Sequence, residues 1–301
     1  MSRVIAIGNF DGVHRGHQAI LRGAREKAGE GTVVALTFWP HPLQVVDPEA
    51  SPDLLCEIHE RVGLLRACGA DEVSVVEFTE ELAHWTPAQF VERVLWPQSA
   101  ATVVVGENFR FGHKAEADGD QLRALSQGAF DVFLLPMLDD GGPVSSSRIR
   151  AAIACGDPAL ASQMLGRPFR FTGMVQLGDQ RGRALGFPTA NLSVPAKRAC
   201  PADGVYAGYL LSGSQQWPAA ISVGTTPTFD GSRRRVEAHA LGRDDLNLYG
   251  EEVGVDFVAH VRPQMRFRSA DALVEQLNLD VEAVRVALTS QAKTPSDGQI
   301  L

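Results

Sequence analysis

With 301 residues, of which 45% are hydrophobic and 21% charged, the chain has the composition of a folded protein of about two domains rather than of a disordered one. Its formal net charge of -8, without a long basic run, disfavours binding of extended nucleic acid, and no apolar run approaches the length of a membrane span. Four scattered cysteines predict neither a disulfide framework nor a zinc site. We therefore expect a cytoplasmic protein that binds small phosphorylated ligands, with neither nucleic acid nor a membrane as a partner.

Strands and helices alternate through the first half of the chain. Short apolar segments predict strands at residues 4–7, 32–38, 72–77, 102–105 and 130–135. The segments between them predict helices at residues 17–27, 56–68, 86–95 and 120–127. This alternation is typical of a parallel sheet covered by helices on both faces, in which ligands bind at the carboxyl ends of the strands.

A glycine-rich loop follows the first predicted strand and leads into a helix with two histidines at its start. The loop consists of Gly8, Asn9, Phe10, Asp11, Gly12, Val13 and His14. Glycines let the backbone approach a ligand closely, and the NH groups and dipole at a helix start attract anions. His14 and His17 are three residues apart, so both imidazoles can donate to one phosphate chain. The competing interpretation is an ordinary strand-to-helix turn with solvated histidines.

Three further segments are expected at the same edge of the sheet. Residues 37–42, TFWPHP, follow the second strand, and their two prolines restrict the backbone. Such a rigid segment could hold aromatic side chains as one wall of a binding site. After the fourth strand, Asn108 can bond a base or a ribose, and Arg110 can meet a phosphate. Ser147 is one of three serines that open a helix as N-caps or phosphate donors. Taken singly, a rigid loop explains the first segment and an ordinary cap the last at least as well.

The pattern changes in the second half of the chain. A helical segment at residues 151–165, which Gly156, Asp157 and Pro158 break into two short helices, is followed by short strands with Gly and Pro turns. These strands, from residue 169 to about 267, predict a small antiparallel barrel. An amphipathic helix at residues 269–288 should pack on this barrel. We predict three parts: a first domain at residues 1–165, a second at 166–288, and a disordered polar tail at 289–301.

The barrel half carries its own candidate chemistry. Thr189 and Asn191 are two residues apart, so in an extended chain they point to the same side, where their oxygens suit Mg²⁺ completed by nucleotide phosphates. A polar turn is the competing interpretation. Glu237 and His239 share one face of a predicted strand, and a carboxylate there can act as general base on a substrate hydroxyl. A solvated glutamate on an open sheet face is the alternative.

Several motifs, taken together and in order, resemble the bacterial bifunctional riboflavin kinase/FMN adenylyltransferase family, also called FAD synthetase. In the first half these motifs are GNFDGVHRGH, TFWPHP, the segment Gly-Glu-Asn-Phe-Arg-Phe-Gly and SSSRIR. In the second half they are GRALGFPTANL, Gly-Val-Tyr-Ala, Gly-Thr-Thr-Pro-Thr-Phe, Val-Glu-Ala-His and Leu-Tyr-Gly. The resemblance covers residues 1–288 and implies an α/β Rossmann-like nucleotidyltransferase domain followed by a small antiparallel β-barrel riboflavin kinase domain with a C-terminal helix.

The resemblance also implies roles for individual residues. In the first domain the residues that handle the ATP phosphates would be His14, His17, Ser147 and Arg150, of which both histidines and Arg150 are catalytic candidates, with Asn108 near the nucleotide. The loop residues Gly8, Asn9, Phe10, Asp11 and Gly12 would help to bind ATP or flavin. In the second domain the binding residues would be Gly182, Arg183, Gly186, Pro188, Thr189 and Asn191. Thr189 and Asn191 would also hold Mg²⁺, and Glu237 would be the base.

The chain departs from the family pattern at a few positions. The loop at residues 113–118 is longer than usual and lacks the usual arginine. Ser147 replaces a common threonine and Trp39 a common glutamate, while Thr226 and Asn247 replace a usual asparagine and aspartate. The loop difference concerns flavin affinity, whereas Ser147 keeps a hydroxyl group.

The implied reactions are phosphorylation of riboflavin to FMN by Mg²⁺-ATP in the second domain and adenylylation of FMN to FAD, with release of pyrophosphate, in the first. Two alternatives stay open: a chain in which only the kinase half is active, and a flavin-binding or regulatory protein without turnover. A pure binder has no use for a base beside a metal site, which argues against the second alternative. The sequence leaves the oligomeric state open.

Overall fold

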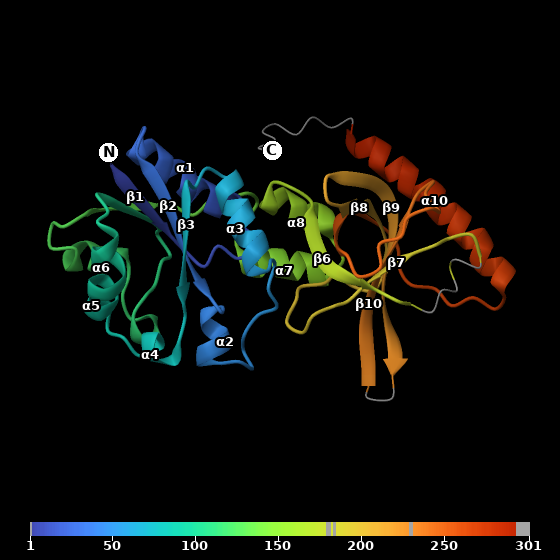
Figure 1. Ribbon diagram of the computed structural model, residues 1–301, viewed down its shortest axis with the longest axis horizontal. Helices are drawn as coiled ribbons and strands as arrows, with labels where there is room; N and C mark the ends of the chain where they lie inside the picture. The colour runs from blue at the N-terminus through green and yellow to red at the C-terminus, as the bar shows by residue number, and fades with distance from the viewer. Residues whose placement is uncertain (1, 179–181, 183–184, 229–230, 293–301) are drawn as a thin grey trace. The chain divides into compact units, whose positions relative to one another are not determined.

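The computed structural model describes the chain except residues 1, 179–181, 183–184, 229–230 and 293–301 (Figure 1). The chain divides into two compact units after Ser146. The predicted boundary at Leu165 lies two helices further along, and where the functional domains divide stays a prediction.

The first unit is built on a five-stranded parallel sheet. Its strands are β1 (Arg3–Ile7), β2 (Thr32–Trp39), β3 (Glu72–Glu77), β4 (Thr102–Gly106) and β5 (Asp131–Leu135). They lie in the order β3-β2-β1-β4-β5, and every neighbouring pair is parallel. All five strands agree with the predicted segments to within one residue at either end. The parallel α/β prediction is therefore confirmed.

Helices cover both faces of this sheet (Figure 1). Val4 and Ala6 of β1 pack in one apolar cluster with side chains of α1 (Arg15–Ala28) and α3 (Ile58–Ala67). Ile5 and Ile7 point to the opposite face, where the cluster includes side chains of α5, η1 and α6. The remaining helical segments of the unit are α2 (Pro42–Val46), α4 (Glu80–Ala83), α5 (Pro87–Phe90), the π-helical η1 (Val91–Leu95), η2 (Trp96–Gln98), η3 (His113–Ala115) and α6 (Gly119–Leu125).

The second unit is a closed six-stranded barrel with antiparallel neighbours. Its strands are β6 (Phe169–Gln176), β7 (Ala190–Leu192), β8 (Gly204–Ser212), β9 (Gln215–Thr228), β10 (Gly231–Ala240) and β11 (Glu252–Arg262). The order around the barrel is β10-β7-β6-β11-β8-β9, and β10 also pairs with β9 to close it. The far ends of β9 and β10 pair only with each other and project from the barrel as a long hairpin (Figure 1). The predicted antiparallel barrel is confirmed.

Helices also belong to this part of the chain. α7 (Ser146–Ala154) and α8 (Pro158–Leu165) are separated by the predicted break at Gly156 and Asp157. α10 (Ala270–Ala292) packs on the barrel through Val284 and Leu288, which share an apolar cluster with residues of β8 and β11. This helix was predicted to end at residue 288 but continues to Ala292, so the first four residues of the predicted disordered tail are helical; the other nine lie outside the described residues.

Candidate active sites

The glycine-rich loop after β1 is tightly wound at the carboxyl edge of the sheet. Its backbone turns through the left-handed region at Phe10, Gly12 and Val13, with φ of 51°, 79° and 41°. Such angles are uncommon for Phe and strained for a β-branched residue such as Val, and they persist only where surrounding contacts hold them. Phe10 and Val13 are fully buried, so the core of the first unit supplies those contacts.

The two histidines of the loop meet at the start of α1. His14 is the N-cap, and its Nδ1 accepts a hydrogen bond of 3.3 Å from the backbone NH of His17. The two rings are stacked, with centroids 3.6 Å apart, and the edge of Phe10 packs against His17. A Cβ on Gly16 would lie 3.1 Å from the His14 ring, so a glycine here allows the ring to lie close to the helix. The structure thus brings both histidines together, as their spacing predicts.

His17 is held in its neutral form. Burial, the neighbouring His14 and the positive charge of Arg61 together keep the pKa of His17 well below its usual value of 6.5. At neutral pH a neutral imidazole can donate a hydrogen bond to a phosphate but brings no positive charge to it. In a phosphate site at this place, positive charge would have to come from other groups, such as arginine side chains and the NH groups at the helix start.

The other predicted residues of the first site lie on neighbouring elements. Asn108 comes two residues after the end of β4, and β4 is the partner of β1, so Asn108 and the glycine-rich loop lie at the same edge of the sheet. Ser147 and Arg150 are on α7. They belong to the second unit, so their approach to the histidines stays a prediction. The preceding Ser146, the last residue of the first unit, donates a hydrogen bond of 3.0 Å to the carbonyl of Asp11 in the loop.

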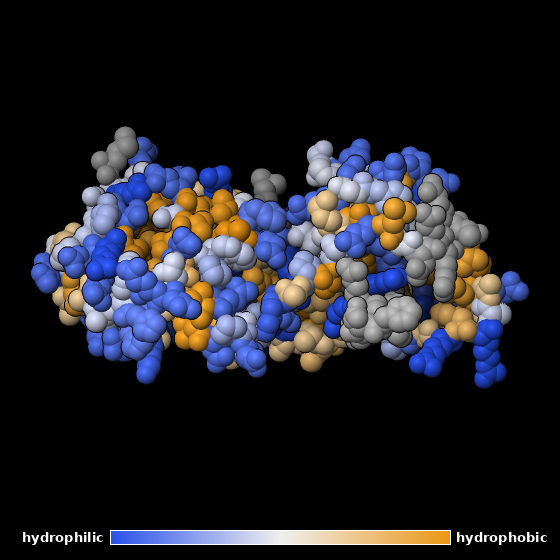
Figure 2. Space-filling model, turned by 60° about the horizontal axis from the view of Figure 1, so that its bottom comes forward, coloured by the Kyte–Doolittle hydropathy of each residue, from blue (hydrophilic) through white to orange (hydrophobic). Residues whose placement is uncertain are grey.

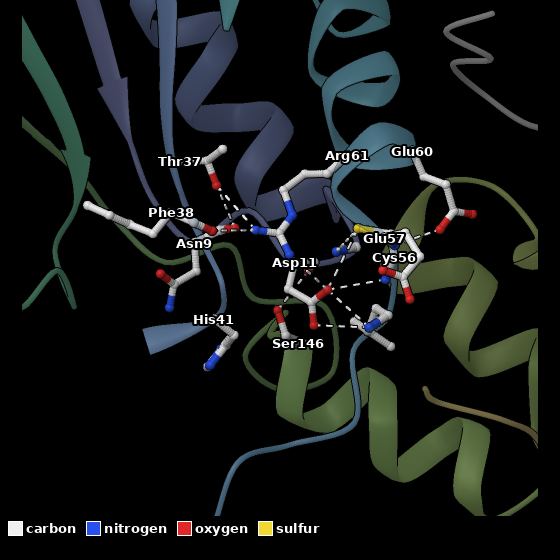
Figure 3. A network of polar contacts seen from close by, with 12 residues as sticks. Asn9, Asp11, Thr37, Phe38, His41, Cys56, Glu57, Glu60, Arg61 and Ser146 are labelled. Atoms are coloured by element: carbon white, nitrogen blue, oxygen red, sulfur yellow. Dashed lines mark hydrogen bonds and ion pairs between the residues drawn. The ribbon is translucent and has the colours of Figure 1, made fainter. Parts of the chain in front are cut away.

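The side chain of Asp11 points inward and is 1% exposed. Its carboxylate accepts hydrogen bonds from the backbone NH groups of Leu55 and Cys56, at 3.0 and 3.2 Å (Figure 3). It also faces Arg61 of α3, with 3.7 Å between Oδ1 and Nη2. The Asp11 carboxylate therefore holds the loop in place, and its part in ligand binding would come through the backbone that it fixes.

Reasoning from the sequence missed Arg61, which is fully buried. A cation in an ordinary helix is expected on the solvent side, and no phosphate-binding motif includes this residue. One signal was present: Arg61 lies four residues before the buried Leu65, and therefore on the apolar stripe of α3. An arginine on such a stripe requires a buried partner.

Apolar side chains lie around the same edge of the first unit. Leu43 and Val46 of α2, after β2, are 41% and 60% exposed, and Met137, after β5, is 37% exposed. Figure 2 looks toward the side on which β2 and β3 end in Figure 1 and shows hydrophobic side chains gathered on the first unit among polar ones. Exposed apolar surface beside a loop that can bind phosphate would suit a ligand that joins a phosphate to a flat ring system.

The loop that departs from the family pattern is an ordered turn. Phe111 and Ala117 exchange two backbone hydrogen bonds of 3.0 Å, which close the loop between them. Asp118 then caps α6, accepting from the NH groups of Asp120 and Gln121. The Nη1 atom of Arg110 lies 3.9 Å from Oδ2 of Asp118. Whether this turn accepts a flavin stays a prediction.

In the barrel, Thr189 and Asn191 lie side by side, as predicted. The Asn191 amide nitrogen donates to the Thr189 hydroxyl oxygen over 3.4 Å, and both residues line a cavity with Arg243 and Tyr249. No described residue donates a hydrogen bond to the Asn191 amide oxygen. The two side chains carry neutral oxygens of the kind that Mg²⁺ accepts together with nucleotide phosphates, although here the amide nitrogen of Asn191, and not its oxygen, is turned toward the Thr189 hydroxyl.

Glu237 lies directly opposite Asn191 in the pairing of β10 with β7. Side chains of directly paired residues share one face of a sheet, with Cβ atoms about 5 Å apart. The carboxylate is about one-third exposed and lies 4.0 Å from Arg235. His239 is on the same face, and its Nδ1 donates to the Pro188 carbonyl at 2.8 Å. Glu237 and His239 of β10 therefore lie on the same face as Asn191 of β7, which has Thr189 beside it.

The segment before Thr189 folds back on itself. The NH groups of Leu185 and Phe187 both donate to the carbonyl of Gly182, at 3.0 and 2.8 Å, and Gly186 has φ of 84°. This turn leads through Pro188 into β7, so the predicted binding residues Gly182, Gly186 and Pro188 border Thr189. The predicted binding residue Arg183 lies outside the described residues.

None of the described helices is both long enough and apolar enough to cross a membrane. The family model for FAD synthetase matches residues 1–148, and the model for riboflavin kinase matches residues 165–288. The bifunctional riboflavin kinase/FMN adenylyltransferase of Escherichia coli K12 is 37% identical over 92% of this chain and 90% of its own length. The Pseudomonas fluorescens enzyme of the same name is 36% identical, with 96% and 94% covered.

Among solved structures, that of a macrolide-efflux protein from Streptococcus pneumoniae is 33% identical, with a TM-score of 0.86 over 94% of each chain. The chain belongs to the bifunctional riboflavin kinase/FMN adenylyltransferase family.

Proposed function

We propose that the barrel phosphorylates riboflavin to FMN and that the first unit adenylylates FMN to FAD, each with ATP. The observation that carries this assignment is that two separate residue sets occur, one suited to each reaction. The first is a pair of stacked histidines at a helix start, and the second is a carboxylate directly opposite Asn191, which lies beside Thr189.

In the barrel, the reacting group of riboflavin is its 5'-hydroxyl, which is a poor nucleophile at neutral pH. Glu237 takes the hydroxyl proton as the oxygen attacks the γ-phosphorus of ATP, and ADP leaves. Thr189 and Asn191 would hold Mg²⁺ together with the ATP phosphates, and the ion supplies neutralisation of their charge. Because Glu237 and Asn191 are paired across β10 and β7, base and nucleotide lie within reach of one substrate.

In the first unit, the FMN phosphate is already an anion and needs no base. One of its oxygens attacks the α-phosphorus of ATP, the bond to the β-phosphate oxygen breaks, and pyrophosphate leaves. The task of the protein is to stabilise negative charge at the phosphates. The NH groups at the start of α1 and the neutral His17 donate hydrogen bonds there, and Ser147 and Arg150 are proposed to complete the site.

Two single substitutions separate the reactions. Glu237→Gln should lower the rate of riboflavin phosphorylation about 100-fold or more and leave FAD formation from supplied FMN unchanged. His17→Ala should do the reverse. Chromatography of reactions started with riboflavin or with FMN, in ATP and Mg²⁺, measures both rates on one preparation. Loss of both activities in either folded variant would contradict the assignment of separate sites.

The same assay with the unaltered chain distinguishes the alternatives. FMN that accumulates without FAD would mean that only the barrel is active, and the turn at residues 113–118 would be the first segment to replace with that of a relative. Flavin binding without turnover of either substrate would favour a regulatory protein. The cytoplasmic location and the absence of a nucleic-acid partner stay predictions.

A further inference from the structure

Arg61 is among the largest fully buried side chains that the structure describes, and it links three segments of the first unit. Its Nη1 donates to the Phe38 carbonyl at 3.1 Å and to the Thr37 hydroxyl at 3.3 Å, both at the end of β2. Its Nη2 faces the Asp11 carboxylate in the glycine-rich loop (Figure 3). Its own helix, α3, is the third segment.

Thr37 provides a second hydrogen-bonded link between Arg61 and the glycine-rich loop. Its hydroxyl accepts from Arg61 and donates to the carbonyl of Asn9 at 2.9 Å. The loop is thus attached to the end of β2 through Asn9 and to Arg61 through Asp11. The carbonyl of Asp11 in turn accepts from Ser146, at the start of α7.

The end of β2 leads into the TFWPHP segment, which borders the same edge of the sheet. The Trp39 ring lies against the guanidinium of Arg61, with 5.6 Å from Cζ to the ring centroid, a separation at which a cation and an aromatic face attract each other. Arg61 therefore contacts both segments that flank the edge: the loop with the histidines and the segment that follows β2.

Stability alone is a poor explanation for this arrangement. Removing two charges from water is costly, and apolar side chains of similar volume commonly stabilise a core as well or better. The pair is also imperfect as a stabilising contact, because Nη2 and Oδ1 are 3.7 Å apart and the Arg61 Nε has no hydrogen-bond partner among the described residues. What the pair does achieve is a fixed distance between the loop and the end of β2.

We propose that Arg61 is a positioning residue for adenylylation. Through Asp11 and Thr37 it holds the glycine-rich loop and the segment after β2 in the relative positions that binding of FMN and ATP requires. The inference rests on the proposed function of the first unit. The effect of the Arg61 charge on His17 supports it, since the same side chain that fixes the loop also favours the neutral imidazole.

The test compares three variants of the full-length chain: Arg61→Met, Asp11→Asn and the double variant. Each single change leaves one buried partner uncompensated, so both should lower the urea midpoint of unfolding. The double variant removes both charges and should recover much of the midpoint. We expect its turnover of FMN to FAD to stay about 100-fold below the unaltered chain, because the loop is no longer held in place. Riboflavin phosphorylation in the same tube is the internal control.

A matched control lies at the opposite edge of the same sheet. Arg25 of α1 bonds Asp71, just before β3, at 2.6 Å, and Asp71 also accepts from the NH of Val33. The double variant Arg25→Met, Asp71→Asn should form FAD at a rate within about twofold of the unaltered chain, since neither residue contacts the glycine-rich loop.

The outcomes separate the inference from the proposed function. If the Asp11→Asn, Arg61→Met chain regains FAD formation along with its urea midpoint, the pair is only structural and the inference is wrong. If the control double variant loses FAD formation equally, the loss is not specific to the Arg61 network and the inference is likewise wrong. If the unaltered chain itself forms no FAD from FMN, it is the function proposed for the first unit that fails.

Discussion

His17 occupies a place where a positive charge is costly, and this couples folding to pH. Its pKa is well below 6.5 in the folded protein and near that value in the unfolded chain, so on acidification the unfolded state takes up the proton first. The contribution of His17 to stability is therefore fully present above about pH 6.5 and is lost as the pH falls below it, by at most about 1.4 kcal/mol per pH unit.

Urea unfolding at a series of pH values between 7.5 and 5.5 measures this coupling. We expect the His17→Gln variant, whose side chain does not titrate, to lose less free energy of unfolding over this range than the unaltered chain. The comparison uses slopes rather than absolute values, because the substitution also changes packing against Phe10. Equal slopes for the two chains would show that His17 is not held neutral.

Gly178 is a second residue whose replacement should have a specific effect. A Cβ at this position would lie 2.5 Å from the side-chain amide of Asn191, so an alanine must displace that side chain. We expect Gly178→Ala to lower riboflavin phosphorylation by about 10- to 100-fold, because the cation ligands lose their mutual position, and to leave FAD formation from FMN unchanged. Unaltered phosphorylation would argue against Asn191 as a ligand.

At the scale of single elements, α3 contains an exposed glycine in its interior. A Cβ on Gly63 would meet no atom within 4 Å, so an alanine fits without rearrangement. Alanine reduces the conformational freedom lost on folding, and Gly63→Ala should raise the free energy of unfolding of the first unit by about 0.5–1 kcal/mol. Denaturant unfolding checks this, with both activities expected to be unchanged; a destabilised chain would show that α3 cannot accept the methyl group.

The elements themselves were largely predictable, because their signals are local. Apolar runs located the five parallel strands, and Gly156 with Pro158 located the break between α7 and α8. The end of α10 was missed by four residues, since polar residues continue a helix as readily as they form a loop. The closure of the barrel through β10 and β7 depends on contacts distant in sequence, which periodicity does not contain.

In the candidate sites, too, the sequence predicted local contacts but not contacts between residues that are distant in the chain. The stacking of His14 on His17 and the contact of Thr189 with Asn191 follow from spacing on one helix turn and on one strand. That Glu237 faces Asn191 required the register of β10 against β7. The inward direction of Asp11 required its partner, Arg61, which lies 50 residues later on a different element.

At the scale of the whole molecule, FMN is the product of one reaction and the substrate of the other, and the residues proposed for the two reactions do not overlap. A chain with Glu237→Gln and a chain with His17→Ala should therefore form FAD from riboflavin when mixed, although neither does so alone. We expect a lag while released FMN builds up, measured by chromatography over time. Failure of the mixture, with each remaining single activity intact, would mean that FMN must pass between sites within one chain.

The strand order of the barrel sets when each half of the enzyme can mature on the ribosome. β11 is the last strand to be synthesised, yet it lies between β6 and β8. Until residue 262 has emerged, both neighbours present unpaired edges, which are sites for wrong association with other chains. The first unit, complete by residue 146, can fold long before this. The parallel sheet of a nascent chain can therefore fold while the barrel still lacks β11, and the edges of β6 and β8 stay unpaired until that strand appears.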